Sequence, residues 1–301
     1  MLKLKNEYKQ YDKKWAEHNY SAKGESKTIK SSGCGPTCAA IVIQTLRPGK
    51  TVTPVTTADW SMKHGYKALN QGTYYTYFEP QFKAYGLVCG QLNNSSVYGK
   101  TEATVHKKAK AALLAGDILI ACMGKGRWTS SGHFIVVYGF DGTYVYISDP
   151  ASTAANRAKA KWVDFAKEVK YYFQCSTGTV CKITAKCCLY KKRDIKRGMF
   201  SALKKGTSIR HVYDCGDGWS ICVYGDNVGY IKNTAIGKNG LSSYNKVVVK
   251  KKSVFRKSNS KLSKQIGTVP AGAKVARITK RKYWTNIIYN GTKGYIITKN
   301  L

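Results

Sequence analysis

Acidic residues are scarce in this sequence. Only 16 of its 301 residues are Asp or Glu, against 51 Lys and Arg, so the formal net charge is +35. A chain this basic repels itself unless it meets an anionic partner. Three polyanions are candidates: nucleic acid, an anionic membrane, and a Gram-positive cell wall that bears teichoic acids. A basic surface kept for solubility is the alternative, although added acidic residues usually serve solubility better.

Long apolar runs and paired cysteine motifs are missing as well. No stretch reaches the length of a transmembrane helix, and Met1–Glu7 lacks the apolar core of a signal peptide. We therefore expect synthesis in the cytoplasm without a signal peptide. The 10 cysteines are scattered and form no pair of CxxC motifs, so we expect no metal or other cofactor. Reduced thiols are a better interpretation than a disulfide framework, which is typical of small secreted domains.

The positive charge is concentrated in the C-terminal part. Residues 1–175 hold 24 basic and 12 acidic residues, a balance of +12, whereas residues 176–301 hold 27 and 4, a balance of +23. No acidic residue follows Asp226. An anionic partner is therefore expected to bind the C-terminal part. A nucleic-acid-binding protein is an alternative that charge alone suggests, because no recognised binding motif accompanies the basic residues.

The C-terminal part also contains an internal repeat, with motifs that recur at an offset of 65 or 66 residues. The pairs are Leu189-Tyr190-Lys191 with Val254-Phe255-Arg256, Leu203-Lys204-Lys205-Gly206 with Val269-Pro270-Ala271-Gly272, Trp219 with Trp284, Tyr224 with Tyr289, and Gly229-Tyr230-Ile231 with Gly294-Tyr295-Ile296. Short alternating strands with glycine turns predict two small all-β barrels, over residues 178–240 and 243–301. Their joint is expected at Gly237–Asn245, which is rich in Gly, Asn and Ser.

Residues 1–175 predict a mixed α+β domain. A glycine turn and a buried helix are expected over Ser31–Leu46, because apolar residues occur nearly all round it and Pro36 suits its first turn. Asp141-Gly142 is a strong hairpin signal. The other predicted helices and strands are Thr57–Lys63, Glu79–Tyr85, Ala103–Ala115 and Ala154–Lys170 as helices, and Ile118–Met123, His133–Phe140 and Tyr144–Ser148 as strands.

Cys34 is the candidate nucleophile, because a helix N-terminus stabilises a thiolate with its partial charge and unpaired N–H groups. Such a cysteine needs a base, and His133 stands at the start of an apolar strand. Asp149 ends the next strand; it and His133 are each 8 residues from Asp141, so a hairpin would bring them side by side. Gln10 is a candidate side-chain donor to an oxyanion. The alternatives are an inert buried cysteine and an ordinary strand-end histidine.

These pieces resemble the papain-like, bacteriocin-leader-type (peptidase C39-like) cysteine peptidases. The matching motifs are Gln10-Tyr11-Asp12-x-x-Trp15, Ser32-Gly33-Cys34-Gly35-Pro36-Thr37, Gly132-His133-Phe134-Ile135-Val136 and Ser148-Asp149-Pro150. The resemblance implies a papain-like fold with Cys34 as nucleophile and His133 as base. It also implies Asp149 as the residue that orients the base and Gln10 as the oxyanion donor, although Gln10 lies farther from the cysteine than its counterpart in papain.

The two repeats resemble bacterial SH3-like domains, which commonly carry wall hydrolases to the Gram-positive envelope. Candidate contacts to peptide or glycan are Trp219, Tyr224, Trp284 and Tyr289; the alternative is that they are barrel core or structural surface. Together the resemblances imply a peptidoglycan hydrolase similar to a phage endolysin. It would be a cysteine peptidase or amidase that acts at the cell wall after release, with peptidoglycan and anionic wall polymers as partners.

Two other functions share this chemistry or fold. A cysteine peptidase that processes a protein or leader peptide would use the same residues, but such peptidases usually belong to membrane exporters. A non-catalytic wall-binding protein could keep only the fold. The complete set of Gln10, Cys34, His133 and Asp149 argues against that second alternative.

Overall fold

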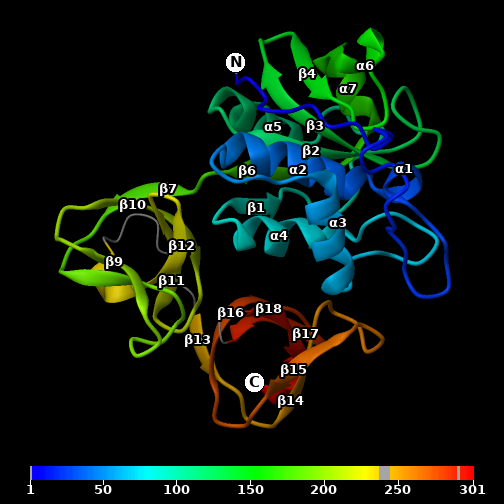
Figure 1. The fold of residues 1–301 in the computed structure, drawn as a ribbon. Helices are drawn as coiled ribbons and strands as arrows, with labels where there is room; N and C mark the ends of the chain where they lie inside the picture. Colours follow the sequence, from blue (N-terminus) through cyan, green and yellow to red (C-terminus); the bar gives the residue numbers. More distant parts are fainter. Residues whose placement is uncertain (1, 237–244, 290–291) are drawn as a thin grey trace. The chain divides into compact units, whose positions relative to one another are not determined.

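The computed structural model describes residues 2–236, 245–289 and 292–301 of the chain. It divides into two compact units, Met1–Thr177 and Gly178–Leu301, drawn from blue to green and from yellow-green to red in Figure 1. The described residues form 7 α-helices and three antiparallel sheets of six strands each, so the predicted mixture of α and β structure is confirmed. Within the described ranges, no helix is both long enough and apolar enough to cross a membrane.

The first unit is built on one six-stranded sheet with the order β1-β6-β2-β3-β4-β5. Its strands are β1 (Val88–Gln91), β2 (Ile118–Met123), β3 (His133–Phe140), β4 (Tyr144–Ser148), β5 (Lys159–Lys161) and β6 (Val169–Ser176). Its helices are α1 (Ile29–Ser32), α2 (Cys34–Leu46), α3 (Pro54–Lys63), α4 (Phe78–Ala84), α5 (Thr104–Leu114), α6 (Ala155–Ala158) and α7 (Trp162–Glu168), with a short 3₁₀ turn at Tyr75–Tyr77.

Helices cover both faces of this sheet. Successive residues of a strand point to opposite faces, and β2 is buried along its whole length. Ile118, Ile120 and Cys122 belong to the core shared with α2 and α4, whereas the intervening residues of β2 belong to the core shared with α5 and α7. The centre of the sheet, where α2 meets β3 (Figure 1), is therefore a rigid base for side chains at the ends of these elements.

Most elements of the first unit lie where the sequence predicts them. The three predicted strands have the observed bounds, and α2 begins at Cys34 as expected. One helix, α3, begins at Pro54 rather than Thr57. Thr53 caps it by accepting a hydrogen bond from Thr56 N, and Pro54 occupies the first turn.

The continuous helix predicted over Ala154–Lys170 is wrong. That stretch contains α6, the short strand β5, α7 and the first residues of β6. Ala160 of β5 pairs with β4 and is buried, while its lysine neighbours are exposed, so period-2 burial replaces helical periodicity. Strands β1 and β6 were not expected either; they pair with each other, and β6 also pairs with β2.

The second unit contains two sheets with the same strand order, as expected of a duplicated sequence. The orders are β7-β10-β11-β12-β8-β9 and β13-β16-β17-β18-β14-β15. The strands are β7 (Thr179–Lys182), β8 (Cys187–Tyr190), β9 (Met199–Leu203), β10 (Ser208–Asp214), β11 (Trp219–Tyr224), β12 (Asn227–Lys232), β13 (Asn245–Val248), β14 (Ser253–Arg256), β15 (Gln265–Val269), β16 (Lys274–Lys280), β17 (Trp284–Tyr289) and β18 (Thr292–Ile297). The predicted joint falls at residues 237–245, of which 237–244 lie outside the described residues.

One pair of repeat motifs is shifted by a residue relative to the sequence alignment. Tyr190 of β8 pairs with Tyr230, and Arg256 of β14 pairs with Tyr295. Tyr190 therefore corresponds to Arg256, an offset of 66 rather than 65. The burial supports this register, because Leu189 then corresponds to the equally buried Phe255 rather than to the exposed Val254.

The glycine of each Gly-Tyr-Ile motif is required by close packing. A Cβ on Gly229 would lie 2.6 Å from the carbonyl oxygen of Tyr190, and one on Gly294 would lie 2.7 Å from that of Arg256. Real Cβ atoms do not approach backbone that closely, so only glycine lets the neighbouring strand pack here. The isoleucine of each motif, Ile231 or Ile296, is fully buried in its sheet's core.

Candidate active site

Cys34 is the first residue of α2, directly after the short helix α1 and Gly33. The junction is tight, since a Cβ on Gly33 would lie 2.6 Å from the carbonyl oxygen of Ile29. Cys34 is partly exposed, whereas residues Gly35–Gln44 of the helix are buried. Cys34 is therefore at a partly exposed end of a helix whose middle is held in the core. Cys38, one turn further, is buried, and its thiol donates to the carbonyl oxygen of Phe134 at 3.3 Å.

The surroundings of Cys34 favour its thiolate. Burial by itself raises the pKa of this thiol, but a hydrogen bond and the charge of His133, with the N–H groups of Phe134 and Gly35, lower it below its usual value of 9.0. These donors come from both the strand start and the helix start, and the helix terminus adds its partial positive charge. A lowered pKa makes a thiol nucleophilic near neutral pH.

His133 is the first residue of β3 and is buried. Its Nε2 lies 2.8 Å from Oδ1 of Asp149, which leaves Nδ1 as the ring nitrogen for Cys34. Burial lowers the pKa of the imidazole, yet hydrogen bonds to Asp149 and Cys34 and their negative charges raise it from 6.5 to about 9. The two shifts have opposite directions, so the contact favours transfer of the Cys34 proton to His133.

The two strands do not place His133 and Asp149 directly opposite each other, as the count from Asp141 suggests. Phe140 pairs with Val145, so the hairpin is centred between Gly142 and Thr143 rather than on Asp141, and after a bulge between Val137 and Gly139 the register is Val136 with Ser148. Asp149 is thus opposite Ile135, two residues from His133. The side chains still meet because β4 ends at Ser148 and Asp149 turns at the same sheet edge.

Asp149 is enclosed by donors. Its Oδ1 also accepts from Ala151 N at 2.8 Å, and its Oδ2 accepts from Arg157 Nε at 2.7 Å. Burial raises the pKa of this carboxyl, but His133, the Ala151 N–H and the charge of Arg157 lower it below 3.8. Lys9 Nζ donates to the carbonyl oxygen of Asp149 at 2.8 Å. The carboxylate is thus ionised and fixed in orientation.

Arg157 is a site residue that sequence reasoning missed. It lies on α6, and besides contacting Asp149 its Nη2 donates to the carbonyl oxygen of Trp128 at 2.5 Å. Trp128 belongs to the loop that leads into β3. The sequence signal is weak, because the stretch around Arg157 predicts one continuous helix over Ala154–Lys170, whereas Arg157 lies on the short helix α6.

Gln10 links the two parts of the site. Its N–H donates to the carbonyl oxygen of Pro150 at 2.8 Å, and its side-chain Nε2 donates to the carbonyl oxygen of Lys30 at 2.6 Å. Pro150 follows Asp149, and Lys30 lies in α1, just before Cys34. An amide nitrogen has two hydrogens, so the one that Lys30 does not accept is available for another acceptor.

The structure does not gather the four aromatic candidates of the second unit. Trp219 and Tyr224 begin and end β11, and Trp284 and Tyr289 begin and end β17. Residues five apart on a strand point to opposite faces and lie about 16 Å apart. The ring of Tyr289 packs on Phe255 at 6.4 Å within the core, whereas Tyr224 is exposed.

None of the ten cysteines, all of which lie among the described residues, is in a disulfide. Across the part of the chain that the structure describes, no three His, Cys, Asp or Glu side chains are arranged so that they could hold a metal ion. The groups at the candidate site are thus a thiol, an imidazole, a carboxylate, a guanidinium and an amide.

Comparison with known structures gives only weak likenesses. The structure of NlpC2 from Trichomonas vaginalis is 18% identical, with 40% of this chain and 46% of that chain covered and a TM-score of 0.19. The structure of NlpC1 from the same organism is 17% identical, with 40% of this chain and 44% of that chain covered and a TM-score of 0.19. The chain therefore spans less than half of either protein. The structure of Ly7917 with the hydrolyzing product of MDP is 15% identical, with 70% of this chain and 88% of that chain covered and a TM-score of 0.24.

No curated protein has a matching sequence. Residues 7–180 match the Peptidase_C39 like family, a span that covers more than half of the chain and includes Gln10, Cys34, His133 and Asp149. The chain therefore belongs to the Peptidase_C39 like family.

Proposed function

We propose that this protein is a cysteine peptidase or amidase that cleaves amide bonds in Gram-positive peptidoglycan. The observation that carries the chemistry is the line of contacts from Cys34 at the start of α2, through His133, to Asp149. A thiol, a base and an oriented carboxylate in this order are what nucleophilic attack on an amide requires.

In the first half of the proposed reaction, the Cys34 thiolate attacks the carbonyl carbon and forms a tetrahedral oxyanion. The imidazolium of His133 gives its Nδ1 proton to the leaving nitrogen, the C–N bond breaks, and an amine leaves. A thioester between Cys34 and the acyl group remains. The Asp149 carboxylate holds the ring through Nε2 and stabilises its positive charge before that proton is given up.

In the second half, neutral His133 takes a proton from water, and the resulting hydroxide attacks the thioester. The C–S bond breaks, the acid product leaves, and the Cys34 thiolate forms again beside the imidazolium. Two donors would stabilise both oxyanions: the backbone N–H of Cys34 and the side-chain amide of Gln10. The Lys30 carbonyl, which engages Gln10 Nε2 at 2.6 Å, fixes the direction of that amide.

We assign the C-terminal repeats, residues 178–240 and 243–301, as two SH3-like wall-binding domains that follow a papain-like domain over residues 1–175. Two six-stranded sheets of the same order support this duplication. The balance of +23 over residues 176–301 suits anionic wall polymers. Trp219 and Trp284, at equivalent positions, are the first aromatic side chains to test as ligand contacts, with Tyr224 and Tyr289 after them.

The test is clearance of purified Gram-positive walls by wild type and by Cys34→Ala. We expect wild type to lower the turbidity of the suspension, and Cys34→Ala to sediment with the walls without clearing them. Failure of both proteins to clear walls from several species, with binding intact, would exclude a wall hydrolase. In that outcome a protein or leader-peptide substrate is the function to test next.

A further inference from the structure

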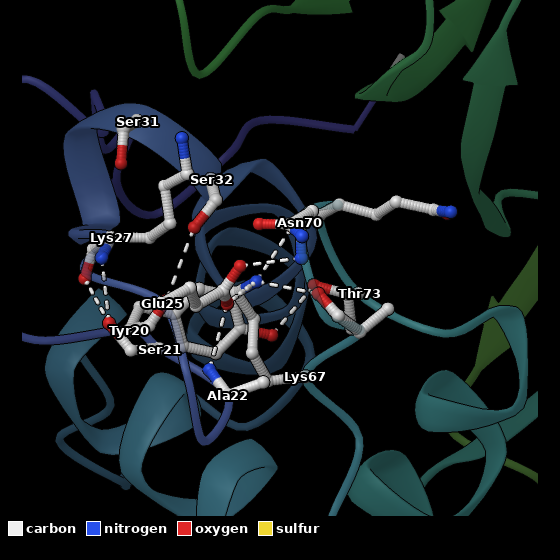
Figure 2. A network of polar contacts seen from close by, with 12 residues as sticks. Tyr20, Ser21, Ala22, Glu25, Lys27, Ser31, Ser32, Lys67, Asn70 and Thr73 are labelled. Atoms are coloured by element: carbon white, nitrogen blue, oxygen red, sulfur yellow. Dashed lines mark hydrogen bonds and ion pairs between the residues drawn. The ribbon is translucent and has the colours of Figure 1, made fainter.

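Two segments that are far apart in sequence meet beside the start of α2. One runs from Tyr20 to Thr28 and the other from Lys67 to Thr73, and Figure 2 shows the side chains that join them. The second segment is closed by a bridge between the backbones of Lys67 and Thr73. Neither segment contributes a group to the reaction proposed above.

A fully buried ion pair connects the segments. The side chains of Glu25 and Lys67 are each only 2% exposed, and the ammonium group contacts Oε1 of Glu25 directly. Lys67 Nζ also donates to the carbonyl oxygens of Ala68 and Gln71, both at 2.7 Å. An ammonium has three hydrogens, and each of them has an acceptor here.

Both carboxylate oxygens of Glu25 also accept hydrogen bonds from backbone N–H groups. Its Oε1 accepts from Ala22 N at 2.8 Å, and its Oε2 accepts from Asn70 N at 2.6 Å. Burial raises the pKa of this carboxyl, but these two N–H groups and Lys67 lower it from 4.5 to about 2. Glu25 is thus charged at neutral pH. The loss of either partner would leave the other buried without its ion-pair partner, which is strongly destabilising.

The pair also holds the backbone of the second segment in an unusual conformation. Asn70 has a φ of 54°, in the left-handed region that costs energy for residues other than glycine. Its N–H is the group that Glu25 accepts from. The carboxylate therefore fixes the turn at its most constrained residue.

The other end of this segment packs against the nucleophile's neighbour. A Cβ on Gly35 would lie 2.5 Å from Oγ1 of Thr73, so the Gly35 backbone and the Thr73 side chain are in close contact. Thr73 Oγ1 is 2.8 Å from the hydroxyl of Tyr20, which is fully buried and also bonds Ser61 Oγ at 2.9 Å. Gly35 in turn supplies an N–H to the Cys34 thiolate.

We propose that the buried Glu25–Lys67 ion pair is a positioning element for Cys34, because it presses the Lys67–Thr73 segment against Gly35 and so fixes the Gly35 N–H that faces the thiolate. This inference rests on Cys34 being the nucleophile. Neither Glu25 nor Lys67 touches a reacting atom. Their effect reaches the thiolate through Thr73 and the backbone of Gly35.

The test is the pH dependence of Cys34 alkylation by iodoacetamide in the full-length protein, which needs no wall substrate. Mass spectrometry of the tryptic peptide separates Cys34 from the buried Cys38 by fragment ions. Wild type, Lys67→Met and Glu25→Gln are compared with Glu17→Gln. Glu17 is the matched control, since its pair with Lys30 is 3.9 Å long and exposed.

We expect the alkylation midpoint to rise in Lys67→Met and Glu25→Gln by at least about half a pH unit, as a hydrogen bond to the thiolate is weakened. Glu17→Gln is expected to match wild type. If the two variants melt at lower temperature but keep the wild-type midpoint, the ion pair is only structural and the inference is wrong. If the alkylation midpoint of Cys34 in the wild-type protein lies near the usual thiol value of 9.0, Cys34 is not an activated nucleophile and the proposed function itself is wrong.

Thr73→Val keeps the inference testable if the charge variants do not fold. Valine retains the volume of Thr73 and leaves the Glu25–Lys67 pair unchanged, but it loses the hydroxyl that is closest to Gly35 and that bonds Tyr20. Its midpoint is expected to rise, whereas Thr73→Ser, which keeps the hydroxyl, is expected to restore it. An unchanged midpoint in a folded Thr73→Val would overturn the route through Thr73.

Discussion

Arg157 holds the carboxylate of Asp149 through the oxygen that His133 does not use. Its Nε donates to Oδ2 at 2.7 Å, while His133 Nε2 lies 2.8 Å from Oδ1. The same guanidinium reaches the carbonyl oxygen of Trp128. One side chain thus connects the carboxylate that contacts His133 to the loop that leads into β3, the strand that His133 begins.

Replacement of Arg157 by Gln is expected to lower the free energy of unfolding by about 1.5–3 kcal/mol, the usual worth of hydrogen bonds to a charged group. It should also lower the rate of wall clearance, because Asp149 loses one of its anchors. Arg157→Lys should rescue little, since an ammonium lacks the planar fork that reaches both acceptors. Thermal unfolding and turbidity assays check this.

Arg127→Gln is the control for that experiment. Its guanidinium contacts the carbonyl oxygen of Asn156 at 3.5 Å and lies 5.3 Å from the centre of the Trp128 ring, rather than against the Asp149 carboxylate, and the residue is exposed. Wild-type stability and wild-type rate in Arg157→Gln would show that the contact to Asp149 has no role.

The activity is expected to follow a bell-shaped pH curve. It should rise as Cys34 loses its proton below the usual thiol pKa of 9.0, and fall as His133 loses its proton at about 9. The raised pKa of His133 also gives stability that is complete below 6.5 and is lost as the pH rises through about 9. Asp149→Asn removes the negative charge beside the imidazole, so the alkaline limb should move to lower pH.

Initial rates of wall clearance at constant ionic strength measure both limbs. A second variant, Asp141→Asn, is the control, because Asp141 bonds its own turn at Thr143 and Tyr144 rather than the imidazole. An alkaline limb that stays in place in Asp149→Asn would contradict the assigned role of Asp149.

The repeated glycines give a prediction on stability. Gly229→Ala should destabilise the second unit by about 1–3 kcal/mol, because the new Cβ would lie 2.6 Å from a backbone oxygen that cannot give way easily. Gly294→Ala should do the same in the second repeat. Gly90→Ala is the control, since a Cβ on that strand glycine meets nothing within 4 Å. Equal melting temperatures of all three variants would contradict the packing argument.

Wall binding is expected to depend on salt and on the equivalent tryptophans. Exposed charges are screened over about 8 Å at physiological ionic strength and about 3 Å at 1 M, so the bound fraction should fall as salt is added. Trp219→Ala and Trp284→Ala should each lower binding further at fixed salt. Sedimentation with purified walls measures this, with Tyr283→Ala, an exposed side chain next to Trp284, as control. A bound fraction that changes neither with salt nor in Trp219→Ala and Trp284→Ala would contradict the assignment of the two repeats as wall-binding domains.

The sequence predicts the positions of these candidate residues well where chemistry and periodicity agree. Cys34 lies at the start of an apolar helix and His133 at the start of an apolar strand, so each is placed by its own element. Arg157 and the Glu25–Lys67 pair could not be predicted in this way. They depend on turns and on a short strand, β5, whose burial comes from pairing with β4 rather than from local propensity.

The register shows the same limit. Counting residues from Asp141 finds the correct partner for His133, because both strands end at one sheet edge. It places the two residues directly opposite each other only if the hairpin is centred on Asp141. Phe140 pairs with Val145, which centres the hairpin between Gly142 and Thr143, and the bulge between Val137 and Gly139 corrects the register by only one residue. The repeat alignment fails by one residue at Leu189 for a similar reason, since burial rather than residue likeness sets the register.

The most direct test of the central claim is mass spectrometry of purified peptidoglycan digested in water enriched in ¹⁸O, with wild type and Cys34→Ala side by side. The thioester route predicts matched fragments in which one carries a new amine and the other a new carboxyl with one ¹⁸O atom. These fragments should be absent with Cys34→Ala. The same fragments from both proteins, or none from wild type under conditions in which it binds walls, would contradict the account.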